Sequence, residues 1–216
     1  MQIAKRTLLT CLLAGASLSA QAAVLSFDDV PNGTRGSFVS AGFAFTLSGL
    51  ASGMYSGQSC GPSCPVNGTV LALAPYGDFL GDSAALTMVK RGGGTFSLVG
   101  FDGAGSFNFN DVHTPANFPR QIDVIGHVLG GASVTQSFLI DTSTLSGPMP
   151  LVSYQFNSSF SNLTSVTFRS SGSSLAMFNG FTVDNIETSP VPEPGSYAML
   201  LAGLGLLGWT RRRRAR

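Results

Sequence analysis

The sequence predicts an all-β fold, an antiparallel β-sandwich or jelly roll, flanked by an N-terminal signal helix and a C-terminal transmembrane helix. Three observations lead to this prediction. Between residues 24 and 187 the chain consists of short runs rich in Phe, Val, Thr and Leu, separated by breaks of Gly, Ser, Asn and Pro. Several of these runs alternate apolar and polar residues with a period of two. No stretch of this region shows a sustained helical period with caps, so helix content should be minor.

The first 22 residues have the three parts of a secretory signal peptide. Lys5 and Arg6 form a positive region, and residues 8–18 form an apolar run of small and aliphatic side chains. Ala20-Gln21-Ala22 offers the small-x-small pattern that signal peptidase requires. We therefore expect cleavage after Ala22, with Ala23 as the next site, and an exported protein. A buried N-terminal helix is the alternative, but the flanking residues favour a signal peptide.

Residues 23–187 form the predicted sandwich. In the run 95–102, for example, Phe96, Leu98 and Gly100 fall on one face and Ser97 and Val99 on the other. This pattern is typical of a half-buried strand. About 165 residues are enough to bury a core between two sheets. Strands are expected in the runs 42–48, 69–75, 95–102, 121–130, 133–141, 151–157, 163–169 and 180–187.

Two cysteines remain after the signal peptide is removed, because Cys11 leaves with it. Cys60 and Cys64 are separated by Gly-Pro-Ser, which is turn chemistry that can bring them within bridging distance. A pair of cysteines in an exported chain indicates a disulfide, here one that closes a short loop. A metal site would need further ligands, and His113 and His127 are the only imidazoles.

Charge and motifs exclude several function classes. Between Ala23 and Ser189 there are five basic and ten acidic residues, a net charge of about −5, which disfavours nucleic-acid binding. The chain has no Gly-x-Ser-x-Gly elbow and no His-Glu-x-x-His pair, so we expect no enzyme. Four Asn-x-Ser/Thr matches are interpreted as turn residues, and they begin at Asn32, Asn67, Asn157 and Asn162.

Four residues near the two ends of the core are candidate calcium ligands. Asp28 and Asp29 follow the first run, and Asp184 and Asn185 lie in the last. Carboxylate and amide oxygens are the ligands that calcium prefers, and the four would converge if the end strands pair. The alternative is that they cap turns and strand ends through hydrogen bonds to the backbone, and the lack of a compact Asp-x-Asp-x-Asp loop favours it. Asp78 and Asp82 form a pair of similar quality.

The layout of the core resembles the galactose-binding-domain-like jelly rolls. The motifs that carry the resemblance are Val24-LSFDDV-Pro31, Gly94-TFSLVGF-Asp102 and the late MFNGFTVDNI, ending at Ile186. The resemblance implies that the first and last strands lie side by side. It also implies a sugar site on loops at one rim, often with a structural calcium. The chain lacks an aromatic platform for a sugar, because its single Trp, Trp209, lies in the tail.

The tail has three parts. Pro190, Pro192 and Pro194 keep the segment 188–196 extended. The apolar run from Tyr197 to Trp209 would be about 20 Å long as a helix, shorter than a bilayer core of about 30 Å. With the core exported, the arginines that follow belong on the cytoplasmic side, so the run is expected to be a stop-transfer anchor.

Val191-Pro192-Glu193-Pro194, the apolar run and the block Arg211, Arg212, Arg213 and Arg214 together resemble the PEP-CTERM sorting signal of Gram-negative bacteria. The resemblance implies recognition of Pro192, Glu193 and Pro194 by an exosortase, a membrane-embedded transpeptidase-like enzyme. Removal of the tail and delivery to the cell surface or extracellular matrix would follow, commonly linked to exopolysaccharide and biofilm. The predicted organisation is signal peptide 1–22, sandwich 23–187, linker with sorting motif 188–196, transmembrane segment 197–210 and cytoplasmic basic tail 211–216.

The sequence therefore predicts an exported, noncatalytic surface or matrix protein. Its predicted partners are signal peptidase, an exosortase-type enzyme and exopolysaccharide. A carbohydrate-binding module with a structural calcium is the alternative function.

Overall fold

A computed structural model describes residues 22–49, 53–56, 65, 67–74, 84–106, 120–141, 150–171, 180–190 and 203. Contacts delimit one compact unit, Ala22–Val191. Among the residues described, no helix is both long and apolar enough to cross a bilayer, and the predicted transmembrane segment 197–210 is represented by Gly203 alone. The signal peptide up to residue 21, the sorting motif and Arg211–Arg214 lie outside the described residues, as do Cys60, Cys64, Asp78, Asp82 and His113.

The described part of the compact unit is built from antiparallel β-strands. This confirms the all-β prediction. The twelve strands are β1 (Ala23–Leu25), β2 (Ser37–Ser40), β3 (Phe43–Ser48), β4 (Gly53–Ser56), β5 (Val70–Ala74), β6 (Ala85–Lys90), β7 (Phe96–Ser106), β8 (Gln121–Val128), β9 (Ser133–Leu139), β10 (Val152–Gln155), β11 (Leu163–Ser171) and β12 (Gly180–Pro190).

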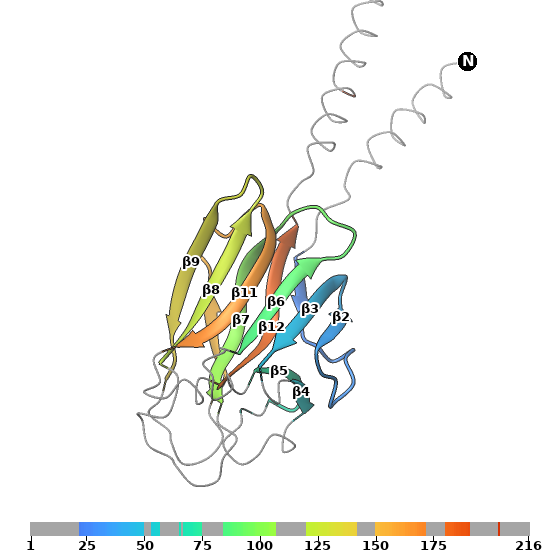
Figure 1. Cartoon of the computed structure of the whole chain (residues 1–216), viewed down its shortest axis with the longest axis vertical. Helices are drawn as coiled ribbons and strands as arrows, with labels where there is room; N and C mark the ends of the chain where they lie inside the picture. Colours follow the sequence, from blue (N-terminus) through green and yellow to red (C-terminus); the bar gives the residue numbers. More distant parts are fainter. Residues whose placement is uncertain are drawn as a thin grey trace, which may run out of the picture. The chain divides into compact units, whose positions relative to one another are not determined.

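The strands belong to one curled sheet with two arms. In the arm that contains β11, the strands lie in the order β2-β3-β6-β11-β8-β9. In the arm that contains β7, the order is β10-β7-β12, and the other edge of β12 pairs with β1 and with β5, which in turn pairs with β4. The two arms are joined where Leu163 of β11 pairs with Phe96 of β7, next to an irregularity in β11. Figure 1 shows the β11 arm in front of β7 and β12.

The hydrophobic core lies between the two arms. Phe101 of β7 packs edge-on against Phe168 of β11, with ring centroids 5.3 Å apart. Phe43 of β3 meets Phe96 of β7 in the same way at 5.1 Å. These rings are buried, and each contributes about 1.5–3 kcal/mol through the apolar area that it removes from water. The alternating burial of β3, β8 and β11 follows from this packing, because one face of each strand meets the core and the other meets solvent.

All eight predicted runs coincide with strands, β3, β5 and β7 to β12. The pairing of the end strands is also confirmed, since Leu25 of β1 lies opposite Ile186 of β12. Two details differ from the prediction. The two layers are one continuous sheet, because a single residue pair joins the arms. Strand β12 continues to Pro190, beyond the predicted boundary at 187, because Thr188, Ser189 and Pro190 keep pairing with β7.

Candidate functional site

Asp184 is a carboxylate in the middle of β12 that is fully removed from solvent, with 0% of its surface exposed. Its Oδ2 accepts hydrogen bonds from Asn67 Nδ2 at 2.7 Å and from the Thr69 hydroxyl at 3.2 Å. Ionised carboxylates are seldom buried unless paired, because removing a charge from water is costly. Both hydrogen-bond donors are neutral, so the charge on Asp184 is not compensated by them.

The two donors come from one tight turn just before β5. Asn67 Oδ1 accepts the backbone N–H of Thr69 at 3.0 Å, which is the geometry of an Asx turn. Gly68 between them has a φ of +87°, a conformation that glycine adopts without a Cβ penalty. The turn therefore holds both side chains over β12, and it confirms the interpretation of Asn67 as a turn residue.

The other carboxylate oxygen, Asp184 Oδ1, is buried and has no hydrogen-bond partner among the described residues. Thr182, two residues earlier on the same strand, is also fully buried and its Oγ1 is likewise without a partner. Residues two apart on a strand share a face of the sheet. A buried polar atom without a partner costs about 1–3 kcal/mol, so two on one face call for an explanation.

Burial raises the pKa of Asp184 from its ordinary 3.8 to about 6. Desolvation is the main cause, and the negative charge of Asp28 acts in the same direction. The backbone amide of Asn185 and the side chains of Asn67 and Thr69 act in the opposite direction by stabilising the charged form. The net result is a carboxyl group that changes protonation in mildly acidic solution.

The backbone is strained next to Asp28 and next to Asp184. Phe27, next to Asp28, has a φ of +59°, and Asn185 has a φ of +46°. A non-glycine residue in the left-handed region costs of order 1–3 kcal/mol, although Asn tolerates it better than Phe. Asn185 lies where the register between β12 and β7 shifts, which marks a bulge. Strain of this kind often occurs at functional sites.

The structure separates the four predicted calcium ligands into three environments. Asp28 interacts electrostatically with Asp184 and accepts a hydrogen bond from Ser26. Asp29 instead accepts the Ser40 hydroxyl at 2.6 Å and the Ala41 amide at 3.4 Å, so it caps the turn between β2 and β3.

Asn185 belongs to a separate polar contact on β7. Its Nδ2 donates to Asp102 Oδ2 at 2.8 Å, and Asp102 Oδ1 also accepts the hydroxyl of Ser153 from β10. The alternative that these side chains cap turns and strands thus describes the observed role of Asp29, whereas Asn185 donates to a side-chain carboxylate. Asp28 and Asp184 are the two that remain available to a ligand.

A hard cation partly fits the Asp184 environment. The Oδ1 of Asp184 and the Oγ1 of Thr182 are buried oxygens without partners, and Asp28 adds a second carboxylate nearby. Calcium takes six to eight oxygen ligands, including backbone carbonyls and water. Within the described ranges no three His, Cys, Asp or Glu side chains lie close enough to hold a metal. Side chains described there would supply at most two charged ligands, so carbonyls and water would have to complete the shell.

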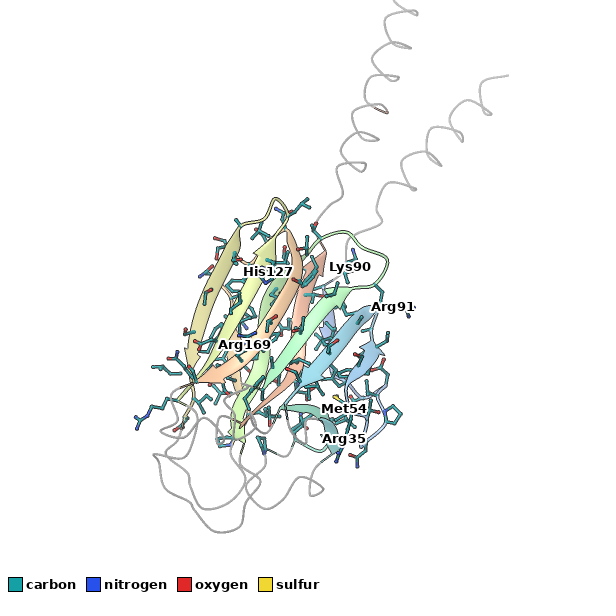
Figure 2. All side chains as sticks on the ribbon, in the orientation of Figure 1. Arg35, Met54, Lys90, Arg91, His127 and Arg169 are labelled. Atoms are coloured by element: carbon teal, nitrogen blue, oxygen red, sulfur yellow. The ribbon has the colours of Figure 1, made fainter. Side chains whose placement is uncertain are left out.

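His127 does not form part of this site. It is exposed on β8, and its Nδ1 lies 3.1 Å from the Ser133 hydroxyl on β9 (Figure 2).

Sequence reasoning missed Asn67, Thr69 and Thr182 as neighbours of Asp184. The Asn-Gly-Thr pattern was visible as a turn, but its pairing partner was not, because Asn67 and Asp184 are 117 residues apart in the chain. Thr182 shares a strand face with Asp184, and that relation could have been seen from the period of two.

Comparisons with known proteins identify the tail. A model of the PEP-CTERM protein-sorting motif matches residues 190–214. No curated protein matches the chain. The chain is similar to the K2 cleaved adhesin domain of Lys-gingipain, with 14% identity over 78% of this chain and 99% of that chain and a TM-score of 0.46. It is also similar to an exo-beta-agarase, with 13% identity over 78% of this chain and 25% of that chain and a TM-score of 0.41. A mutant of the lectin binding domain of Lectinolysin is similar with 10% identity over 76% of this chain and 98% of that chain and a TM-score of 0.35.

The match to the PEP-CTERM motif is the finding that bears on how this protein is sorted. It indicates an exported protein that is sorted through processing at the membrane, and it implies that an exosortase carries out that processing.

Proposed function

We propose that this chain is a noncatalytic β-sandwich protein of a Gram-negative bacterium that an exosortase delivers to the cell surface or the extracellular matrix. There it has a structural or adhesive role linked to exopolysaccharide and biofilm. In this proposal the chain is a substrate of the processing enzyme, and Pro192, Glu193 and Pro194 are the residues recognised. The core belongs to the galactose-binding-domain-like jelly rolls, which the side-by-side pairing of β1 and β12 supports.

The observation that carries the proposal is the sorting motif at residues 190–214. Its physical parts agree with the role. Proline has no backbone N–H and cannot continue a β-ladder, so Pro192 and Pro194 favour an extended segment directly after β12, which ends at Pro190. An extended segment is what a processing enzyme binds. The apolar run would then hold the site at the membrane, and the arginines would set its direction.

The experiment is a processing assay in a host that carries the enzyme. Replacement of Glu193 by Ala, or deletion of Arg211–Arg214, is expected to leave full-length protein in the inner membrane. Glu187→Gln is the matched control, because it removes the same charge within β12, six residues upstream. Mass spectrometry of the mature C-terminus reports the cleavage position. Normal processing of both tail variants would exclude the sorting role of these residues.

A second candidate function is a carbohydrate-binding module with a structural calcium. The buried, unpartnered oxygens of Asp184 and Thr182, with Asp28 nearby, support the calcium part. We propose Asp28 and Asp184 as the charged ligands, because Asp29 caps the β2–β3 turn and Asn185 is bonded to Asp102. When bound, calcium would neutralise the buried charge and tie the first strand to the last.

The outer face of the β11 arm supports a polysaccharide partner. Short hydroxyl side chains occupy five of the six strands there, and two pairs approach each other at 3.2 Å, Ser37 with Thr46 and Thr87 with Thr167. Register places one row across the strands, consisting of Ser37, Thr46, Thr87, Thr167, Ile125 and Thr135. Hydroxyl groups donate and accept hydrogen bonds to sugar hydroxyls without the desolvation cost of a charge.

Glycan-array binding by the purified protein, with and without chelator, separates the two candidates. A calcium-dependent sugar signal would contradict the purely structural role. If the hydroxyl row binds the sugar, Thr46→Arg and Thr135→Arg should abolish the signal, because both residues are exposed on that face. Val24→Arg, at an exposed position on β1, is the control and should leave it unchanged.

A further inference from the structure

The chain leaves the sheet at an end where four turns lie beside the start of β1, because Ala23 pairs with Thr188. Pro190, the last residue of β12, lies opposite Phe96, the first residue of β7. The turns at the same end are here called the chain-exit end, and they are Ala41–Gly42, Arg91–Thr95, Leu129–Ala132 and Asn157–Asn162. Their positions follow from register and backbone contacts: Arg91 N donates to Gly42 O, Leu129 N to Asn162 O, and Leu98 N to Phe160 O. In Figure 1 the turns between β6 and β7 and between β8 and β9 lie at the end toward which β12 points.

Only six residues separate this end from the apolar run of the tail. Residues 191–196 lie between Pro190 and Tyr197, and fully extended they span about 20 Å. Strand β12 alone, with 11 residues, is about 36 Å long. While the tail is inserted, therefore, the chain-exit end stays within about 20 Å of the bilayer, whereas the opposite end of the sheet can lie farther away.

Two basic residues lie at the chain-exit end. Its four turns contain one charged residue, Arg91, and Lys90 precedes it at the end of β6. Lys90 donates weakly to the Thr95 carbonyl at 3.5 Å, and in the described part of the chain neither cation has an ion-pair partner. Two acids belong to the same end: Asp29, which accepts the Ala41 amide of the β2–β3 turn, and Glu187, three residues before Pro190 on β12. Figure 2 shows Lys90 and Arg91 away from Arg35, which lies at the opposite end.

An apolar side chain is exposed on the same end. Leu129 opens the hairpin turn between β8 and β9 and leaves 68% of its surface in solvent. The turn continues with Gly130, Gly131 and Ala132, so nothing charged stands beside the leucine. Basic residues with an exposed apolar tip are the features that bind proteins to the headgroup region of a membrane.

We infer that the chain-exit end docks on anionic phospholipid headgroups, with Lys90 and Arg91 as the electrostatic contacts and Leu129 entering the interface. The docking rests on the proposed function, since it requires the tail to be inserted. It holds the sheet upright on the membrane before processing and keeps residues 191–196 at the surface where a membrane enzyme acts. Cleavage of the tail would free the domain, because two cations and one leucine alone bind a membrane weakly and reversibly.

The inference is tested by hydrogen exchange of the chain without its signal peptide but with its tail, residues 23–216, reconstituted in vesicles. One set of vesicles is phosphatidylcholine, and the other also contains phosphatidylglycerol. Each basic residue held near an anionic surface changes the population of the docked state about fivefold. Exchange of the amides in Arg91–Thr95 and Leu129–Ala132 is expected to slow in the anionic vesicles alone, and to recover when about 1 M salt shortens the Debye length to roughly 3 Å.

Two double variants provide matched charges. K90Q/R91Q is expected to lose the slowing, whereas R35Q/R120Q removes the same charge at the opposite end and should retain it. Leu129→Ser should reduce the slowing of exchange in anionic vesicles, and the remaining slowing should still depend on salt. Equal exchange in both lipids, or equal effects of the two double variants, would overturn the inference. The salt experiment uses the unmodified chain, so it does not depend on whether a variant folds.

Flotation of the vesicles distinguishes the two proposals. If the chain does not float with the vesicles, the tail is not inserted, and both the proposed function and the docking fail. If it floats and the exchange is independent of lipid charge, the docking alone fails. If K90Q/R91Q reduces cleavage by the enzyme without any lipid-dependent exchange, the basic turn binds the enzyme instead, and the docking is wrong.

Discussion

Replacing Asp184 by Asn should make the protein more stable at neutral pH and should flatten the dependence of its stability on pH. The folded pKa of Asp184 is about 6 and its ordinary value is 3.8, so between these values the folded state binds more protons than the unfolded state. The free energy of unfolding therefore falls as pH rises through this range, and stays constant above it. Below about pH 4 the protonated Asp184 resembles an asparagine, and the two proteins should be similar.

The size of the effect follows from the same two values. The difference between 3.8 and about 6 corresponds to about 3 kcal/mol, at 1.36 kcal/mol per pKa unit. This figure is an upper limit, because it takes the whole shift as a difference between the folded and the unfolded state. Asn at this position can still accept the hydrogen bond from Asn67. We therefore expect Asp184→Asn to be more stable than the unmodified protein by up to about 3 kcal/mol at pH 7.5 in the absence of divalent cations.

The assay is urea denaturation with chelator at a series of pH values from 4 to 8. Asp28→Asn is the informative control, because Asp28 raises the pKa of Asp184 less than burial does. This control should reduce the fall in stability but leave most of it. A free energy of unfolding that rises between pH 4 and 6, or a slope that survives in Asp184→Asn, would refute the reasoning.

Calcium should offset most of the stability difference between Asp184→Asn and the unmodified protein. A cation bound at Asp184 stabilises the folded state by about 2.7 kcal/mol when its concentration is one hundred times the dissociation constant. The unmodified protein should gain this stability at pH 7.5, and Asp184→Asn should not. An equal response of both proteins to calcium would exclude Asp184 as a ligand, while the pH prediction would stand on its own.

Three further predictions concern the core and the untested disulfide. Gly100→Ala should destabilise the fold by about 1–3 kcal/mol in urea denaturation, because the new Cβ would lie 2.8 Å from the Tyr154 carbonyl oxygen, and an unchanged midpoint would contradict this register. Phe168→Ala should cost about 3–5 kcal/mol by the same measurement, because the ring is fully buried; a loss under 1 kcal/mol would mean that it does not fill the core. Peptide mapping without reductant should recover Cys60 and Cys64 in one linked peptide, and their joint replacement by Ser should cost about 2 kcal/mol, as expected for a five-residue loop; free thiols on both would exclude the bond.

The repeated alternation of apolar and polar residues was enough to locate eight of the twelve strands. Phe96 and Leu98 are buried and Val99 is exposed, as the period of two predicts. Such a pattern is local, because side chains two apart on a strand share a face whatever the rest of the chain does. Strands β2, β4 and β6 lie outside the predicted runs. Strands β2 and β4 have only four residues each, and β6 has apolar residues at adjacent positions, Ala85–Leu86 and Met88–Val89, so a period of two is not visible in it.

The sorting tail is likewise a property of the sequence alone. An order of prolines, a short apolar run and an arginine block can be read without knowing what the preceding domain looks like, and residues 190–214 match the motif model. The tertiary structure added where the domain ends, since the pairing of Pro190 with Phe96 leaves six residues before the apolar run.

The roles of the acidic residues were decided by the tertiary structure. Asp28 and Asp29 are neighbours in the chain, yet one affects the charge of Asp184 and the other caps the turn at Ser40. Asp184 is buried because β12 lies between β7 and β5 and because the turn at Asn67 covers it, and the sequence separation of 117 residues hides that contact from any local pattern. Strand positions depend on short-range periodicity, which the sequence contains directly. The burial, pKa and ligand-binding capacity of one carboxyl group depend on which distant segments meet it, and those are determined only when the sheet is assembled.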